Sequence, residues 1–201
     1  MTDRTRERIG IFGGTFDPPH VGHLVTAVNV RHALRLDRVL LVVAGSPWQK
    51  EGTRPISPAA DRLAMVEAAV GDVEGIEASD IEVRRTGPSY SADTLTELLA
   101  EDPDRKLFLV VGSDAAAGLA TWERIDEVCR LAELVVVDRP GVDASFEVPA
   151  GFQVRRVEAP RLEVSSTDLR ARVLDGRPLD YLLTPAVIAS IEQRRLYRVA
   201  G

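Results

Sequence analysis

Cysteine is nearly absent from this chain. Among its 201 residues there is one, Cys129, which cannot form an internal disulfide. A chain of this length buries about 70% of its unfolded surface, so it folds without disulfides or a structural metal. A lone thiol is typical of a reducing compartment, and we expect a cytoplasmic protein.

Long hydrophobic runs and excess positive charge are missing as well. The longest apolar run, VLLVVAG from Val39, is far too short to cross a bilayer. The start of the chain, MTDRTRERIGIF, is charged and contains no hydrophobic secretory segment. The formal net charge of −6 argues against a general nucleic-acid-binding protein, which would be basic. We therefore expect no membrane and no nucleic-acid partner, whereas a small anionic ligand needs only local positive charge.

The apolar runs that are present are short and rich in Val, Ile and Leu. Continuous runs of this kind are typical of strands buried on both faces of a parallel sheet, and helical patterns lie between them. This alternation predicts an α/β fold, a doubly wound parallel sheet with right-handed crossovers. The predicted strands are residues 9–12, 39–43, 107–112 and 134–137. The predicted helices follow His23 and the cap Ser57, begin at Ser91, and lie around residues 122–132.

The C-terminal part is predicted to be a small helical subregion. Ser165 or Ser166 can cap one helix, and Thr184 before a proline starts another. The length fits a single domain over residues 1–201, with the helical subregion at about 165–198. The sequence leaves the oligomeric state open, a homo-oligomer included.

The stretch GIFGGTFDPPHVGH follows the first predicted strand, at the carboxyl edge where open α/β sheets bind ligands. Gly13 and Gly14 allow the backbone to approach a ligand closely and can adopt positive φ. The helix that begins near Gly22 offers N–H groups and a dipole that attract anions. The arrangement predicts a phosphate site, although the chain contains neither G-x-x-x-x-G-K-[ST] nor G-x-G-x-x-G.

Two histidines in this stretch, His20 and His23, are three residues apart, so their side chains can converge on one point. Zinc would need at least one more ligand, and the remaining His and Cys residues are poorly placed, so we predict no metal site. Alone, the pair could be ordinary solvated or capping histidines; beside two glycines and a helix start, phosphate binding is favoured. Asp17 is expected to hold the turn rather than a metal.

Two motifs give the chain a resemblance to a known family. GGTFDPPHVGH (13–23) resembles the first motif of nucleotidylyltransferases with a His-x-Gly-His loop. VSSTDLR (164–170) is similar to their second motif, with Val164 where Ile is more usual. Over about residues 9–198 the order of further segments resembles bacterial nicotinate-nucleotide adenylyltransferases, namely GPSYSADTL (87–95), GSD (112–114), TW (121–122), VVDRP (136–140) and RRLYR (194–198).

The resemblance implies a Rossmann-like fold and transfer of AMP from ATP to nicotinate mononucleotide in NAD biosynthesis. The products would be nicotinate adenine dinucleotide and pyrophosphate, with Mg²⁺ as a cofactor held mainly by the ATP phosphates. The attacking phosphate monoester is already mostly dianionic at neutral pH. The reaction therefore needs positioning and charge neutralisation, and no general base.

The resemblance also implies roles for individual residues. His20, His23 and Arg170 would be catalytic and would hold the ATP phosphates, with Arg170 in the first turn after the serine cap. The remaining ATP-binding residues would be Gly13, Gly14, Thr15, Lys50, Gly112, Asp114, Arg139, Ser166 and Thr167. The mononucleotide would be bound by Thr15, Tyr90, Ser91, Trp122 and Glu123, with its ring stacked on Trp122.

Some of these residues also have simpler explanations. Lys50 and Arg139 could be solvated surface charges, Asp114 the cap of a helix, and Trp122 a core residue. Three other functions are alternatives: adenylation of another phosphate such as phosphopantetheine, CMP transfer, and nucleotide binding by a non-catalytic regulator. The segments 87–95 and 121–122 argue against the first two, and the intact histidines argue against the third.

Overall fold

Six parallel strands form one sheet in the computed structural model, which describes residues 6–47, 55–71, 73–138, 150–160 and 162–198. The strand order is β3-β2-β1-β4-β5-β6. Three of the four inner strands, β2, β4 and β5, are almost continuously buried because both faces of the sheet are covered. The strands are β1 (Arg8–Gly14), β2 (Arg38–Val43), β3 (Ile76–Ser79), β4 (Lys106–Gly112), β5 (Ala132–Asp138) and β6 (Val154–Glu158).

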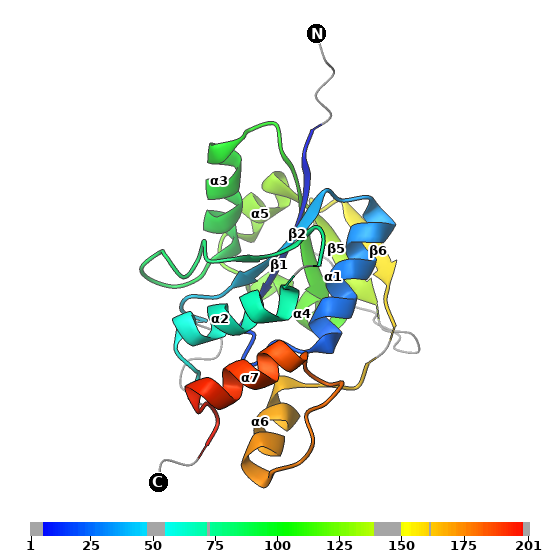
Figure 1. Cartoon of the computed structure of the whole chain (residues 1–201). Coiled ribbons are helices and arrows are strands. Elements are labelled where there is room, and N and C mark those ends of the chain that lie inside the picture. Colours follow the sequence, from blue (N-terminus) through cyan, green and yellow to red (C-terminus); the bar gives the residue numbers. More distant parts are fainter. Residues whose placement is uncertain (1–5, 48–54, 72, 139–149, 161, 199–201) are drawn as a thin grey trace.

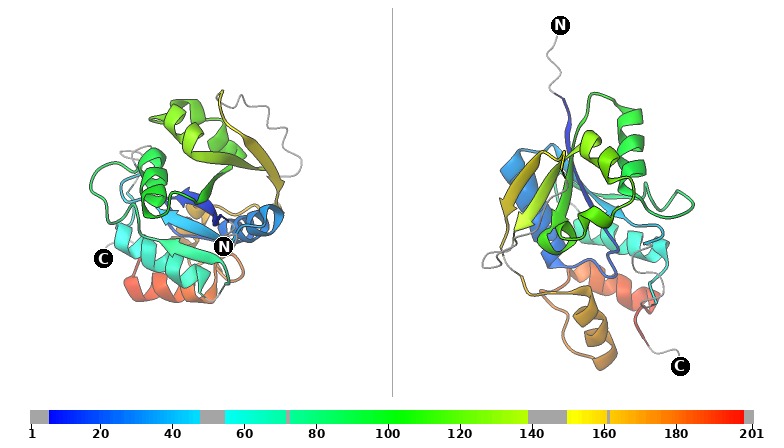
Figure 2. Two further views of the ribbon diagram at one scale, coloured as in Figure 1. Left: turned by 90° about the horizontal axis from the view of Figure 1, so that it is seen from above. Right: turned by 180° about the vertical axis from the view of Figure 1, so that it is seen from behind.

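Helices cover both faces of this sheet (Figures 1 and 2). Val30 of α1 and Val66 of α2 belong to the hydrophobic cluster on one face. Leu95 of α3 and Val128 of α5 belong to the cluster on the other. The helices between the strands are α1 (Val21–Leu34), α2 (Ala59–Val70), α3 (Ser91–Glu101), α4 (Ser113–Ala116) and α5 (Ile125–Leu131), with a short 3₁₀ turn at Leu119–Thr121.

The direction in which the sheet grows reverses between β1 and β4. The chain builds outward from β1 through β2 to β3, and then returns to place β4 on the other side of β1. The helix after β1 packs on one face, whereas α5, which follows β4, packs on the other. A crevice therefore opens at the carboxyl ends of β1 and β4, where doubly wound folds bind their ligands.

Two C-terminal helices, α6 (Ser166–Asp175) and α7 (Pro185–Arg194), lie together at the end of the molecule opposite the N-terminus (Figure 1). Ser165 caps α6 by accepting a hydrogen bond from the backbone of Asp168, and Thr184 caps α7 in the same way. Their buried side chains share one cluster with α2, made of Met65, Ala69, Leu169, Leu183, Val187 and Ile191. The predicted C-terminal helices and the cap at Thr184 are confirmed.

The predicted parallel sheet and its four predicted strands are confirmed, but two further strands are present. β3 has only four residues, too few for a clear pattern. β6 is an edge strand in which four of the five residues, VRRVE, are exposed, so it shows no buried run. Neither strand has a hydrophobic pattern from which it could be predicted.

Two predicted helix starts are wrong by one or two residues. Pro58 has extended backbone angles, so α2 begins at Ala59 and is not capped by Ser57. The predicted start of α3 at Ser91 is confirmed, and its N-cap is Tyr90. His20 is the N-cap of α1, which starts at Val21, ahead of the predicted start. Within the described residues, no helix is both long and apolar enough to cross a bilayer.

Leu169→Ala should lower the free energy of unfolding by about 2–5 kcal/mol, because Leu169 is fully buried where α6 meets α2 and α7. Leu174→Ala is the matched control on the same helix, at 55% exposure, and should change stability by less than about 0.5 kcal/mol. For the single domain that we predict, tryptophan fluorescence and circular dichroism in urea would report one coincident transition. Two separate transitions, only one of them shifted by Leu169→Ala, would contradict it.

Candidate active site

Two cavities adjoin at the carboxyl edge of the sheet. The larger, of about 570 Å³, lies between the segment after β1 and the start of α6. The smaller, of about 310 Å³, lies between β1, β4 and the start of α3. Phe12, Gly14, Thr15 and Gly112 line both cavities. The two cavities therefore meet at the crevice between β1 and β4.

His20 and His23 lie together in the wall of the larger cavity. Their rings are stacked, with centroids 3.7 Å apart. The backbone N–H of His20 donates to Nδ1 of His23 over 3.1 Å. Because Nδ1 accepts, a neutral His23 carries its proton on Nε2. The predicted convergence of the two histidines is confirmed, and they stand at the N-terminus of α1, where anions are favoured.

Two glycines allow these rings to pack against the backbone. A Cβ at Gly14 would lie 2.8 Å from the ring of Phe16, which makes an edge contact with His23 at 5.0 Å between centroids. A Cβ at Gly22 would lie 3.1 Å from the His20 ring. Gly13 and Gly14 were expected to allow positive φ; both instead continue β1, and Phe16 takes the left-handed conformation at φ 49°. Gly14 and Gly22 matter for close approach, not for backbone angles, whereas a Cβ at Gly13 would meet nothing within 4 Å.

The C-terminal helices hold the segment between β1 and α1. Arg170 donates to the carbonyl of Asp17 over 2.8 Å and to Oγ1 of Thr167 over 3.2 Å. Ser166 Oγ donates to the carbonyl of Pro18 over 2.8 Å. All three of the α6 side chains line the larger cavity. Arg170 is the fifth residue of α6, so the prediction that it lies in the first turn is wrong by one residue.

A buried arginine that the sequence did not single out completes this support. Arg62 of α2 is 1% exposed and donates to the carbonyls of Ser57, Thr15 and Gly45 at 2.9, 2.9 and 3.2 Å. It ties the segments after β1 and β2 to the start of α2. The signal was present, because Arg62 occupies the same helical stripe as buried Met65 and Val66.

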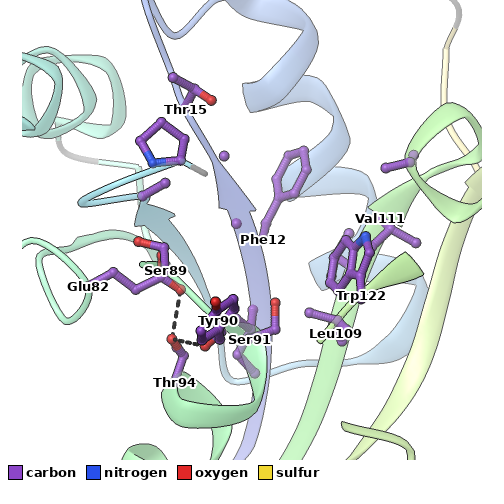
Figure 3. A pocket seen from close by; sticks show the side chains of 18 of the residues that line it. Phe12, Thr15, Glu82, Ser89, Tyr90, Ser91, Thr94, Leu109, Val111 and Trp122 are labelled. Atoms are coloured by element: carbon purple, nitrogen blue, oxygen red, sulfur yellow. Dashed lines mark hydrogen bonds between the residues drawn. The ribbon is translucent and has the colours of Figure 1, made fainter. Parts of the chain in front are cut away.

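The smaller cavity contains the residues predicted to bind the mononucleotide (Figure 3). Tyr90 and Ser91 lie on one side and Trp122 on the other, and Glu123 also lines it. Trp122 also packs against the core, and its role as a stacking surface for the pyridine ring stays a prediction. The N–H groups of the first turn of α3 stand at this cavity, and those of Ser91 and the next residue have no intrahelical partner to reach.

The smaller cavity also contains polar residues that were not predicted. The hydroxyl of Thr94 donates to Oε1 of Glu82 over 2.7 Å (Figure 3). Arg85, which lies behind the lining residues, donates to that hydroxyl over 3.0 Å. Ser89 Oγ accepts from the backbone N–H groups of Gly45 and Ser46 at 2.9 and 3.3 Å. Ser89 and Thr94 lie in the segment 87–95 that carries the resemblance, but no pattern singled out these two residues, Glu82 or Arg85.

The remaining predicted residues are placed as follows. Gly13 lines the smaller cavity. Asp114 lies within α4, whose N-cap is Gly112, so the alternative that Asp114 caps that helix is wrong. Lys50 and Arg139 lie outside the described residues. In the part of the chain that the structure describes, no group of three or more His, Cys, Asp and Glu residues could hold a metal ion.

A doubly wound sheet with a phosphate-type helix start and two adjoining cavities at its switch point defines a nucleotide-binding α/β protein. Comparison with known proteins is more specific. The cytidylyltransferase-like family model matches residues 11–172. A "probable nicotinate-nucleotide adenylyltransferase" of Leifsonia xyli subsp. xyli is 41% identical over 198 residues, covering 98% of both chains. One of the same name from Roseiflexus sp. is 46% identical, covering 94% of this chain and 98% of the relative.

Solved structures agree on the fold. The nicotinic acid mononucleotide adenylyltransferase of Plasmodium falciparum, in complex with NaAD, superposes with a TM-score of 0.76 at 17% identity, covering 96% of this chain and 98% of that one. This chain belongs to the cytidylyltransferase-like family, in its nicotinate-nucleotide adenylyltransferase branch. The predicted family and Rossmann-like fold are confirmed.

Arg170→Lys should weaken ATP binding by at least about tenfold. A lysine keeps the positive charge but lacks the planar fork that donates to Asp17 and Thr167 at once, and a hydrogen bond from a charged group contributes about 1.5–3 kcal/mol. Arg172→Lys is the matched control, since Arg172 faces Asp168 on the same helix. Titration calorimetry would measure both. Unchanged affinity in Arg170→Lys would mean that the site needs only a point charge.

Proposed function

We propose that this chain transfers AMP from ATP to nicotinate mononucleotide, giving nicotinate adenine dinucleotide and pyrophosphate. The observation that carries the proposal is the common wall of the two cavities, formed by Phe12, Gly14, Thr15 and Gly112. A transfer between two nucleotides requires both to bind side by side, with their phosphates meeting. The names of the relatives support the same reaction.

ATP is assigned to the larger cavity because its wall offers the donors that a polyphosphate needs. These are the N-terminus of α1, Nε2 of His23, and the side chains of His20, Thr167 and Arg170. Ser166 lines the same wall, but its hydroxyl already donates to the carbonyl of Pro18, so its predicted role in ATP binding stays a prediction. Thr15, at the wall between the cavities, is suited to contact both substrates. The predicted roles of Lys50, Asp114 and Arg139 in ATP binding stay predictions.

The chemistry is a single displacement at the α-phosphorus. An oxygen of the mononucleotide phosphate forms the new P–O bond, and the bond between the α-phosphorus and the bridging oxygen breaks. Both electrons of the broken bond leave with pyrophosphate. No proton has to be removed from the nucleophile, which is already dianionic. The histidines and Arg170 stabilise the negative charge that develops on the phosphates, and fixed donors of this type contribute about 10²–10³ in rate.

The donor set fits Mg²⁺ held by the phosphates. The carboxylates lining the larger cavity, Asp17 and Asp138, are engaged by the protein: Tyr197 donates to Asp17, and Arg156 donates to both oxygens of Asp138. Mg²⁺ commonly binds substrate phosphates with few protein ligands. Bound in this way, it would neutralise charge on the triphosphate. We also propose a cytoplasmic enzyme, consistent with the single thiol.

The smaller cavity is assigned to the pyridine end of nicotinate mononucleotide. Trp122 offers a stacking surface, and the N–H groups at the start of α3 and near Glu123 are suited to a carboxylate. Glu82 also lines this cavity, where one of its carboxylate oxygens accepts from Thr94, whereas Arg85 donates to the same Thr94 hydroxyl and pairs with Glu97. An amide would turn an NH₂ group toward N–H donors and leave polar groups unpaired.

The test is pyrophosphate release from ATP with three acceptors in turn: nicotinate mononucleotide, nicotinamide mononucleotide and phosphopantetheine. A buried unpaired polar group costs about 1–3 kcal/mol, so kcat/KM should favour the acid over the amide by at least about tenfold to a hundredfold. Phosphopantetheine should give no release. Equal use of the acid and the amide would contradict the proposed arrangement of N–H donors. Preference for phosphopantetheine would contradict the proposed function.

Trp122→Ala should raise KM for nicotinate mononucleotide much more than KM for ATP, because Trp122 lines only the smaller of the two cavities. Thermal melting serves as the control, since Trp122 also packs on the core. A lower Tm together with an equal rise in both KM values would mean that Trp122 serves only the core.

A further inference from the structure

Asp17 places a buried carboxylate in the wall of the cavity to which the proposed function assigns polyphosphate. The residue is 1% exposed and lies between Phe16 and the first proline of the motif. A carboxylate beside phosphates is repulsive unless donors within the protein hold it, and a buried charge without donors is costly. The groups that donate to Asp17 therefore influence the whole segment before His20.

One of these groups comes from the far end of the chain. The hydroxyl of Tyr197 donates to Oδ1 of Asp17 over 2.8 Å, although the two residues are 180 positions apart. The same hydroxyl lies 3.7 Å from Sδ of Met65. Tyr197 packs with the cluster that joins α7 to α2, and its φ of 60° is uncommon for a tyrosine. The surrounding structure thus fixes this side chain in one pose.

The phenol of Tyr197 stays protonated and so keeps its hydrogen bond to Asp17. Burial, and next the negative charge of Asp17, raise the pKa of Tyr197 far above its usual value, so the phenol remains a proton donor. Asp17 is in turn bonded on its other side, because its carbonyl accepts from Arg170 and the N–H of Ser57 lies 3.5 Å from Oδ2. Asp17 therefore links the segment between β1 and α1 to α6, to the start of α2 and to the C-terminal segment.

We infer that Tyr197 is a positioning residue for ATP: its hydroxyl holds the Asp17 carboxylate toward the protein, and this sets the geometry of the segment that carries His20 and His23. The inference rests on the proposed function for the identity of the polyphosphate. It assigns a role in the site to a residue after the last helix, outside the two nucleotidylyltransferase motifs.

Tyr197→Phe tests the inference, because it removes one oxygen and keeps the ring. The matched control is Tyr181→Phe, since Tyr181 is 94% exposed. Titration calorimetry should show ATP binding to Tyr197→Phe weakened by about tenfold to a hundredfold, the range expected for one buried group left without its donor. Nicotinate mononucleotide binding should change less than about twofold. Tyr181→Phe should match the wild type for both ligands.

A double-mutant cycle with Asp17→Asn tests whether Tyr197 acts through Asp17. Adding Tyr197→Phe to Asp17→Asn should weaken ATP binding much less than adding it to the wild type, since residues in contact are not additive. Additive effects would overturn the inference. So would a lower Tm with unchanged ATP affinity, or loss of folding in Tyr197→Phe alone, because the hydroxyl would then serve only the fold. Binding is measured without turnover, so a wild type that releases no pyrophosphate would overturn the proposed function separately.

Discussion

The segment between β1 and α1 has no regular structure, so its shape depends on hydrogen bonds from distant parts of the chain. Arg62 is central to this, because its buried guanidinium donates to Thr15 after β1, to Gly45 after β2 and to Ser57 before α2. A buried cation is costly unless its donors are satisfied, so the three loops are constrained together. Arg170 and Tyr197 add the C-terminal part to the same constraint. The C-terminal subregion thus acts as part of the site.

Within the site held by these hydrogen bonds, different elements supply different parts of the binding surface. The wall between the two cavities is formed by Phe12, Gly14 and Gly112 of the sheet and by Thr15 after β1, and helix starts provide oriented N–H groups on each side. Preorganised donors stabilise charge without having to rearrange during the reaction. For a dianionic phosphate nucleophile, positioning and charge stabilisation are what the protein has to supply. The stacked histidines, Arg170 and Trp122 each suit one part of that task.

Sequence patterns predicted the parts of the molecule that repeat a simple rule. Apolar runs gave the four inner strands, and the motif placed His20 and His23 together. The sequence could not give what depends on tertiary contacts: the exposed edge strand β6, the bonds of Arg62 to three carbonyls, or the polar group of Glu82, Arg85 and Thr94. Gly13 and Gly14 show the limit well. Both line the smaller cavity, but the expected positive φ is wrong, and the observed packing reason for Gly14 is the ring of Phe16 against it.

The central claim is that the two nucleotides meet at the shared wall and react directly. The stereochemical course at the α-phosphorus tests it most directly, using ATP made chiral there with sulfur and a defined oxygen isotope. A single in-line displacement predicts inversion of configuration in the dinucleotide product. Retention would require two displacements through a covalent enzyme intermediate, and would contradict direct transfer between the two cavities.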